Sequence, residues 1–536
     1  MRTQYLPLGI ATLLVVLLAL APIFGVTYIP ANDYPFHLSR VAILSMGDQS
    51  GLLGTYYQFG SWLLPNMALD AFALPLTRWL LPEMAVKLFL ATTQLAFLGG
   101  CVALHRAAFG RYSAWPLLGG LLLYNGIFLW GFFNYLFAAA FALLGAALWL
   151  RLGPGWLRPL VTFGVAVVLM WGHMGGLAVY GILVMGFELS TLLTKTSQQN
   201  WSATLRRTAL DALPFMAALA LFLLVSPGSQ RAGDGLVYSG WWGAKPFAAL
   251  FALQSGVLWA DVLVLLALAL LLLVLTLTRQ LVVRGAMLTA AGSLWLAFVV
   301  MPPEMLGSSF ADVRLVPLAA LVTLLAVAPG DGRSLWVESL VLVVALGVGA
   351  VKTGALLRDW KAQQVKIDSI VRAMQKIPDG STLFAATAEP YTSMMLAKPG
   401  ARESWHPPLK HVASYASVFG SVFVPMTFAD PHKQPMVMLP AYLAVKTLQG
   451  DNPFKVPRPA DLVAVAQRLS AQTQAPGGPA LGEVFLLVVG TDRYLALPPL
   501  EGYTVFFAGD TFAIFQAAAP VSPGVTNISV RRPHGG

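Results

Sequence analysis

The feature that most constrains this chain is a series of apolar runs long enough to cross a lipid bilayer. These runs lie in the first two thirds of the sequence, at residues 6–28, 84–106, 114–130, 132–150, 158–172, 174–194, 208–226, 257–278, 284–301, 313–329 and 335–355. A helix needs about 20 predominantly apolar residues to span the hydrocarbon core of a bilayer. The sequence therefore predicts a mainly α, polytopic transmembrane protein with about eleven spans.

The composition agrees with a membrane protein and excludes several other classes. Apolar residues make up 57% of the 536 residues, and charged residues make up only 11%. Soluble domains carry about 25% charged residues, so a soluble fold, a disordered chain and a coiled coil are all excluded. The net charge of +10 would favour a nucleic-acid partner in a soluble chain. Here most basic residues lie in short loops between apolar runs, which is a topology signal, and we expect no nucleic-acid partner.

Charge density divides the chain near residue 356. Residues 360–536 hold 26 of the 58 charged side chains, although they form only one third of the chain. We therefore predict a transmembrane domain over residues 1–356 and a small α/β domain over 357–520, followed by a disordered tail over 521–536. The predicted α/β elements are helices over 359–376 and 460–474, a strand from 383, a strand over 483–489 and a hairpin over 504–515.

Basic residues occur in every second loop between the predicted spans, and such loops stay in the cytoplasm. This alternation places the N-terminus in the cytoplasm. An odd number of spans then places the α/β domain outside. The two longest external loops are 29–83 and 227–256. Chemistry or recognition is therefore expected on the outer face.

The first external loop carries the strongest local pattern, Asn32-Asp33-Tyr34-Pro35-Phe36-His37. A helix that starts at Asn32 or Asp33, with Pro35 in its first turn, presents Asp33 and His37 on one face. A purely structural interpretation remains open, in which Asp33 caps the helix and His37 lies in the interface. Further along the loop, the aromatic-rich segment 52–62 is predicted to form an interfacial amphipathic helix.

This arrangement resembles the GT-C glycosyltransferases. The resemblance lies in a first helix, an acidic residue at the start of a long external loop, many further helices and a C-terminal external domain. Members of this superfamily use polyprenyl-phosphate-linked sugars; they include oligosaccharyltransferases, protein mannosyltransferases, lipid A aminoarabinose transferases and arabinosyltransferases. The resemblance implies an inverting hexosyl- or pentosyltransferase in the bacterial inner membrane. Its α/β domain would then be periplasmic, its acceptor an envelope glycan, lipid or protein, and Asp33 its catalytic base.

The motif departs from the two-carboxylate form of the superfamily. Asn32-Asp33 offers a single carboxylate, so a bound divalent metal is not favoured and we expect no cofactor. The leaving phosphate needs cations rather than an acid. Candidate substrate-binding residues at the outer face are His37, Arg40, His173, Arg231, Lys245, Arg314, Trp241 and Trp242. The structural alternatives are an Arg314 that snorkels to the interface, a packing role for His173, and tryptophans that rest in lipid.

A second histidine-containing segment lies within the predicted α/β domain. Residues 406–433 contain three histidines and an aspartate, but their spacing matches no zinc motif. We expect this segment to pack on the membrane domain and to shape the acceptor side.

Two other functions share parts of this architecture. A transporter or flippase would show polar residues at mid-span and two inverted halves, and neither is clear in the sequence. A non-catalytic subunit of an envelope polysaccharide assembly system would share the architecture but would not depend on Asp33 for catalysis.

Overall fold

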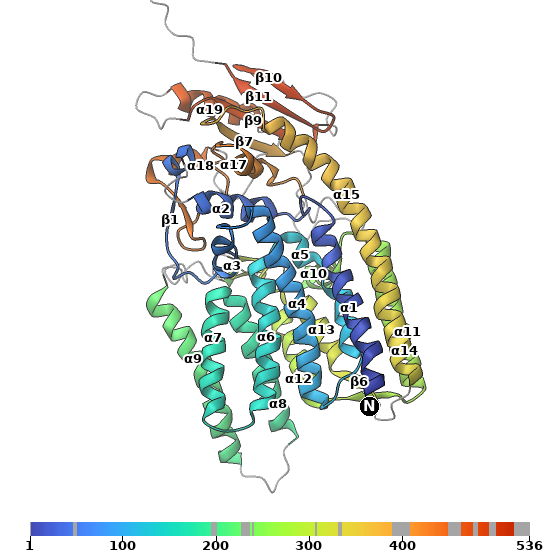
Figure 1. Ribbon diagram of the computed structural model, residues 1–536. Coiled ribbons are helices and arrows are strands. Elements are labelled where there is room, and N and C mark those ends of the chain that lie inside the picture. The colour runs from blue at the N-terminus through green and yellow to red at the C-terminus, as the bar shows by residue number, and fades with distance from the viewer. Residues whose placement is uncertain are drawn as a thin grey trace, which may run out of the picture.

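The computed structural model consists of a bundle of long helices with a smaller mixed α/β part at one end (Figure 1). The structure describes residues 2–46, 51–194, 201–226, 236–237, 241–305, 308–330, 335–387, 408–448, 462–474, 481–491 and 500–518. The N-terminus lies at the end of the bundle that is far from the α/β part. The predicted tail, 521–536, lies outside the described residues.

The predicted fold class is confirmed. Within the described residues, six helices are long and apolar enough to cross a membrane: α4 (Pro82–Phe109), α6 (Phe133–Leu152), α8 (Met174–Leu193), α9 (Trp201–Val225), α11 (Leu258–Leu277) and the continuous helix Trp336–Met374. Shorter apolar helices are the Leu8–Phe24 part of α1 (Arg2–Phe24), Trp115–Trp130, α7 (Leu157–Gly172), α12 (Gly285–Val300) and α13 (Leu315–Leu325). Each predicted run coincides with one of these helices.

The run predicted at 114–130 is not a regular helix, which corrects that prediction. It consists of a 3-10 helix, η3 (Trp115–Leu122), and the short helix α5 (Gly126–Trp130). Asn125 separates the two, and its side-chain oxygen accepts hydrogen bonds from the amides of Ile127 and Phe128. An asparagine that caps in this way starts a new helix, because it satisfies amides that have no partner within the helix.

The α/β part is built on a four-stranded sheet with the order β10–β11–β9–β7. Its strands are β7 (Thr382–Thr387), β9 (Val484–Val489), β10 (Tyr503–Ala508) and β11 (Phe512–Ala517), and α19 (Leu462–Gln474) is a further helix. The neighbours β7 and β9 are parallel, and the other pairs are antiparallel. Every residue of β9 is buried, as expected for an apolar strand in the middle of a sheet.

The helical bundle and the α/β part are joined in two ways. The helix α15 (Gly349–Met374) follows α14 (Leu335–Val343) after a π-helical turn and runs unbroken through residue 356, where we placed the domain boundary (Figure 1). In addition, β1 (Tyr57–Phe59) of the first external loop pairs antiparallel with β8 (Met436–Met438). The helix predicted over 52–62 is therefore wrong, because this segment forms the 3-10 helix η2 (Gly51–Thr55) and a strand. The first external loop is thus part of the interface with the α/β part.

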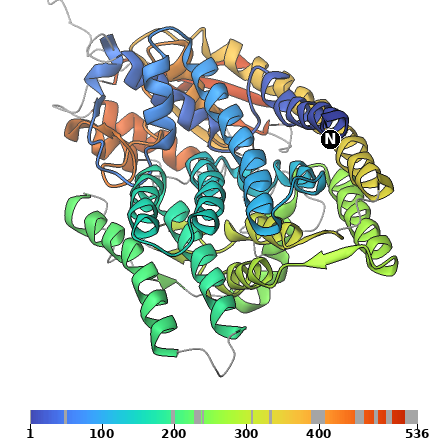
Figure 2. The ribbon, with the colours of Figure 1, turned by 60° about the horizontal axis from the view of Figure 1, so that its bottom comes forward.

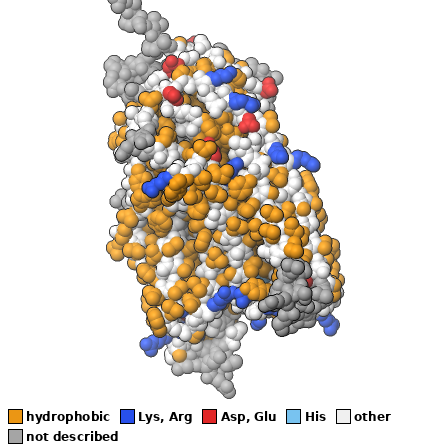
Figure 3. Space-filling view, in the orientation of Figure 1, with side chains coloured by type: hydrophobic (Ala, Val, Ile, Leu, Met, Phe, Trp, Pro, Cys, Tyr) orange, Lys and Arg blue, Asp and Glu red, His pale blue; other side chains and the backbone are white. Residues whose placement is uncertain are grey.

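The surface agrees with a bundle that sits in a bilayer. In Figure 3, apolar side chains cover the middle of the molecule, whereas charged side chains gather at the two ends. Many large apolar side chains on the bundle helices are exposed, among them Leu265, Leu266 and Leu296. Lipid chains would cover such side chains in a membrane.

Candidate active site

Asp33 lies at the end of the bundle that carries the α/β part, between α1 and α2 (Tyr34–Met46). The helix begins one residue after Asp33, with Pro35 in its first turn, as the sequence predicts. The only hydrogen bond that the Asp33 carboxylate accepts within the described residues comes from the Asn32 side chain, Nδ2 to Oδ1 at 3.1 Å. No backbone amide among those residues donates to it. The geometry therefore does not support the alternative in which Asp33 is a helix cap.

Carbonyl oxygens at the end of α5 hold the Asn32-Asp33 segment in place. The Asn32 amide donates to the Leu129 carbonyl at 2.8 Å, and the Asp33 amide donates to the Trp130 carbonyl at 3.3 Å. The Gly131 backbone has a φ of +86°, and a Cβ built there would lie 2.8–3.1 Å from atoms of Asp33. Only glycine fits this position, because a side chain would strain the left-handed backbone and collide with Asp33.

His37 and Arg40, two predicted site residues, lie beside Asp33 on α2. His37 Nε2 lies 2.9 Å from the Gly131 carbonyl oxygen. Because a carbonyl oxygen can only accept a hydrogen bond, Nε2 carries the proton of the neutral ring. The other ring nitrogen, Nδ1, lies 3.3 Å from Arg40 Nη2. Arg40 is fully buried, and its Nε and one Nη donate to the two oxygens of Asp70 at 2.8 and 2.9 Å. Its other terminal nitrogen, Nη1, has no hydrogen-bond partner within the described residues. A buried donor of this kind suits an anionic ligand.

The α/β part supplies the opposite wall of the site. His411 Nε2 lies 3.6 Å from Asp33 Oδ1, and its ring stacks on Phe36 with 3.9 Å between ring centroids. Phe428 also contacts Phe36, and the Ser39 hydroxyl lies 3.1 Å from that of Thr427. The histidine-containing segment therefore packs on α2, as predicted, over the described residues 408–433. The first histidine of that segment, at 406, lies outside the described residues.

Arg314 and His173 form a second polar cluster at the same end of the bundle. The Arg314 guanidinium stacks on the Phe132 ring at 4.0 Å and donates to the Ser308 hydroxyl and the Ser309 carbonyl. Its Nη1 lies 3.5 Å from His173 Nε2. His173 Nδ1 accepts a hydrogen bond from the Gly175 amide, so the proton of the neutral ring is on Nε2. Two N–H donors therefore face the same region, an arrangement that suits an anion between them.

Lys245, another predicted site residue, pairs with Asp312 rather than with Asp33. Lys245 of α10 (Trp241–Leu253) forms an ion pair with Asp312 at 2.6 Å and donates to the carbonyls of Phe298 and Met301. It therefore holds α10 against the neighbouring helix ends. Arg231 lies outside the described residues, as do the side chains of Trp241 and Trp242.

Burial controls the protonation of this site. Burial raises the pKa of Asp33 to about 7, against the smaller opposing effects of Lys410, Arg314 and Arg40. The pKa of His37 falls to about 3 because of burial and the Arg40 charge. Burial and Lys410 also hold the pKa of His411 well below its usual range. Near pH 7 both histidines are therefore neutral, and Asp33 is the group that exchanges a proton.

The described residues contain no group of three His, Cys, Asp or Glu side chains that could hold a metal ion. Arg40, Lys410 and Arg314 are the positive groups whose charges act on Asp33. A negatively charged ligand at this site would therefore meet protein cations.

Comparison with solved structures identifies the fold. ArnT from Cupriavidus metallidurans bound to undecaprenyl phosphate matches 96% of this chain and 99% of its own, with a TM-score of 0.54 and 13% sequence identity. The apo state of the same protein matches 97% and 99%, with a TM-score of 0.53 and 14% identity. The chain has the GT-C fold. No known family profile and no curated protein sequence matches it.

The GT-C fold brings together residues that sequence reasoning did not assign to the site. His411 and Lys410 come from the C-terminal third of the chain, Asp70 comes from the helix α3 (Ala68–Leu76), and Gly131 comes from the turn after α5. Gly131 carried a detectable signal, because it follows the apolar run 114–130 within a short external turn. No local pattern relates His411 to Asp33, since only the packing of the α/β part brings them together.

Proposed function

We propose that this chain is an inverting glycosyltransferase that moves a sugar from a polyprenyl-phosphate donor to a hydroxyl of an envelope glycan, lipid or protein. The observation that carries this proposal is the Asp33 site. A carboxylate with a pKa of about 7 lies at the membrane surface, with Arg40, Lys410 and Arg314 acting on it. The GT-C fold supports the proposal, and so does the structure of ArnT bound to undecaprenyl phosphate.

Asp33 would act as the general base. The acceptor hydroxyl oxygen bonds to the anomeric carbon while its proton passes to the Asp33 carboxylate. The bond from the anomeric carbon to the phosphate oxygen breaks, and its electron pair leaves with the phosphate. Because the acceptor attacks from the side opposite the leaving group, the anomeric configuration inverts. A carboxylate with a pKa near 7 is a stronger base than an ordinary aspartate and is still half deprotonated at pH 7.

The polar cluster of Arg314 and His173 would hold the leaving phosphate. Two N–H groups, Arg314 Nη1 and His173 Nε2, face one region, and the Ser308 hydroxyl lies beside the guanidinium. A guanidinium matches phosphate oxygens in geometry and charge. Cations placed where negative charge develops stabilise the transition state, so this reaction needs no acid for the leaving group. We propose that it needs no metal either.

The orientation in the membrane belongs to the same proposal. The site lies at the end of the bundle that carries the α/β part, and the N-terminus lies at the other end (Figure 1). The alternation of basic loops supports a cytoplasmic N-terminus, and with it a site at the periplasmic face of the bacterial inner membrane.

Replacement of the proposed base tests the function directly. The Asp33→Asn variant keeps the size of the side chain and should fold. We expect its rate of sugar transfer from a polyprenyl-phosphate donor to fall by about 100- to 10,000-fold, the usual effect of losing a general base. Asp510→Asn, which changes an exposed carboxylate in the β10–β11 turn, is the matched control. Near wild-type transfer by purified, stable Asp33→Asn protein would exclude Asp33 as the base and favour a non-catalytic subunit.

A further inference from the structure

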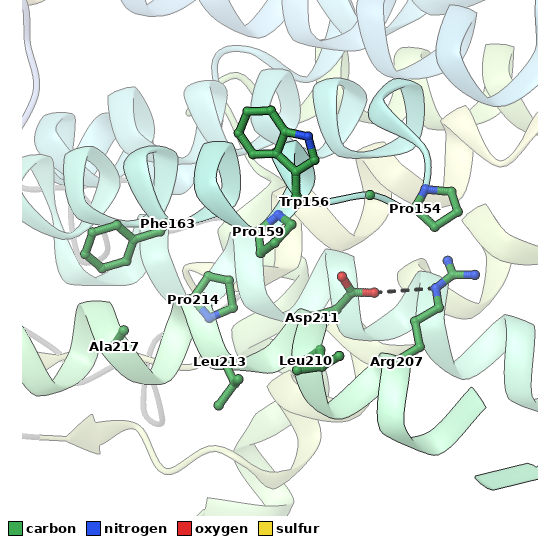
Figure 4. Close-up of a pocket in the computed structure, with 11 residues that line it drawn as sticks. Pro154, Trp156, Pro159, Phe163, Arg207, Leu210, Asp211, Leu213, Pro214 and Ala217 are labelled. Carbon is green, nitrogen blue, oxygen red and sulfur yellow. Dashed lines mark ion pairs between the residues drawn. The ribbon is translucent and has the colours of Figure 1, made fainter. Parts of the chain in front are cut away.

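A cavity of about 580 Å³ lies between α7 and α9, at the end of α7 opposite to His173 (Figure 4). Its volume falls within the range of ligand sites in proteins, about 300–1,000 Å³. One wall comes from Pro154, Trp156, Pro159 and Phe163, and the other comes from residues 207–217 of α9. The Asp33 site and its cations are at the other end of the bundle, so this cavity has no part in the proposed transfer reaction.

Most of the lining is apolar, and the cavity is open to the surroundings of the bundle. Figure 4 shows Pro159 and Phe163 on one side of it and Pro214 and Ala217 on the other. Helix α9 lies at the edge of the bundle (Figure 2), and its Leu210 and Leu213 are exposed. A molecule in the bilayer can therefore reach the cavity from the side. Trp156 is also exposed, as is common for tryptophan at the membrane interface.

One end of the cavity carries charge. Asp211, which is buried, and Arg207, which is half exposed, belong to a cluster with Arg158 and Glu188. Asp211 Oδ2 lies 3.3 Å from an Arg158 nitrogen and 3.7 Å from Arg207 Nε. The cluster contains two arginines and two carboxylates, so its formal charge is zero. A ligand with both a positive and a negative group would match it better than a ligand with only a negative one.

Three atoms of this cluster lack hydrogen bonds within the described residues, and two of them belong to residues that line the cavity. Asp211 Oδ2 and Arg207 Nε are both buried, and neither has a hydrogen-bond partner within the described residues. Buried polar atoms in native proteins almost always have such a partner, so an acceptor and a donor from a ligand are expected here. In Figure 4 the Asp211 side chain points from α9 toward the cavity.

We propose that this cavity binds a zwitterionic phospholipid of the ethanolamine type. Its ammonium group lies against Asp211, its phosphate lies against Arg207, and an acyl chain runs between Phe163 and Leu213. This assignment accounts for three features of the cavity: its apolar lining, its opening toward the bilayer, and the cluster of two arginines and two carboxylates at one end. Basic pockets between membrane helices bind anionic lipid headgroups, and the charge-neutral cluster here suits a zwitterionic headgroup in the same way.

Native mass spectrometry of the purified full-length protein tests this assignment. Added dioleoylphosphatidylethanolamine should bind as a single molecule and should bind more tightly than dioleoylphosphatidylglycerol or undecaprenyl phosphate. Asp211→Asn should weaken the binding by about tenfold, as expected for loss of one hydrogen bond to a charged group. Arg206→Gln changes an exposed neighbour that does not line the cavity, and this control should bind the lipid like the wild type.

A second variant keeps the test decisive if Asp211→Asn disturbs folding. Ala217 is exposed on the apolar side of the cavity, away from the charged cluster, so Ala217→Trp should fill the space of the acyl chain and leave the ion pairs intact. It should lower the bound fraction as strongly as Asp211→Asn. Equal binding of all three lipids, or ethanolamine-lipid binding that Ala217→Trp leaves unchanged, would overturn the proposal. Sugar transfer by these variants should match the wild type, which separates this site from Asp33.

Discussion

At the scale of single residues, the decisive property of Asp33 is that it is charged only part of the time. An exposed aspartate is fully ionised at pH 7 and is a weak base. Asp33 has a pKa of about 7 because the walls on both sides of it exclude water. Proton transfer is most efficient when the pKa of the base lies near the working pH. The same burial that makes the carboxylate costly to ionise would therefore make it an effective base in the proposed transfer.

The pH dependence of transfer follows from this pKa. Only the deprotonated carboxylate can accept the proton of the acceptor hydroxyl, so activity should be low below pH 6 and should rise through about pH 7 to a plateau. His37 and His411, which lie beside Asp33, titrate at lower pH and should not affect the rise in activity around pH 7. The measurement is kcat/KM for sugar transfer between pH 5 and 9. A midpoint near pH 4 would show that the base is solvated like an ordinary aspartate.

His411 should set the midpoint of that profile. It lies 3.6 Å from Asp33 and stacks on Phe36, so His411→Ala opens a path for water to the carboxylate. The pKa of Asp33 should then fall toward its usual value, and the midpoint should move down by about one pH unit or more. The plateau rate should also fall, because the base becomes weaker.

His432→Ala is the matched control, because His432 belongs to the same segment and is less buried than His411. It should leave the midpoint near pH 7. An unchanged midpoint in His411→Ala would mean that this histidine does not control the solvation of Asp33.

The sequence indicated the chemistry of Asp33 and its place at the membrane surface, but not its walls. The acidic residue follows an apolar run, and His37 lies one helical turn later; both facts are local. The burial of Asp33 depends on contacts with the α5 turn and with the segment that contains His411. Such contacts are set by tertiary packing, and a single sequence carries no periodic signal for them.

At the scale of elements, the interrupted run 115–130 explains how the site is supported. Lys352 of α15 donates to the carbonyls of Leu121 and Tyr124, just where the 3-10 helix ends, and forms an ion pair with Asp261 at 3.1 Å. Carbonyls that lose their helical partners inside a membrane need other donors. The ammonium group of Lys352 supplies two such contacts besides its ion pair with Asp261, so it has a structural role within an apolar helix. Hydropathy detects this run but not its break, because a single polar residue hardly changes the average; the local signal for the break is Asn125-Gly126, a polar cap followed by glycine.

Gly131, at the end of the same element, should be more important for activity than for stability. An alanine there must adopt a left-handed backbone, which costs about 1–3 kcal/mol, and its methyl group would press on Asp33. Displacement of a catalytic group by about 1 Å can lower the rate by about 100-fold. We therefore expect Gly131→Ala to remain folded, with a reduced melting temperature and about 100-fold slower transfer.

Gly99→Ala serves as the control, because a Cβ at Gly99 in α4 would meet no atom within 4 Å. Alanine is the better helix former, so this variant should be at least as stable as the wild type and equally active. Normal transfer by Gly131→Ala would show that the α5 turn does not position the base.

At the scale of the whole molecule, the bilayer made much of the fold predictable. Lipid requires long apolar helices, so each span left a clear record in the sequence. The contacts between the bundle and the α/β part left almost no recognisable pattern in the sequence. The strands β1 and β8 are three residues long, and their pairing links residues 57–59 with 436–438. The GT-C fold extends over nearly the whole chain although only 13% of the aligned residues match, which agrees with a fold set by apolar pattern rather than by particular residues.

The last prediction concerns the orientation of this molecule. The bundle has two ends, and the proposed chemistry requires the Asp33 end to face the periplasm. The sequence contains one cysteine, Cys101, which is buried, so single cysteines can be introduced and labelled selectively. Asp510→Cys lies in an exposed turn of the α/β part, and Arg284→Cys lies at the exposed start of α12. Basic loops stay in the cytoplasm, and Arg284 belongs to such a loop. A maleimide that cannot cross the inner membrane should therefore label Asp510→Cys in cells with a permeabilised outer membrane, and should label Arg284→Cys only after lysis. The reverse pattern would place the α/β part and Asp33 in the cytoplasm, which would contradict a periplasmic transferase even if the protein transferred sugar in detergent.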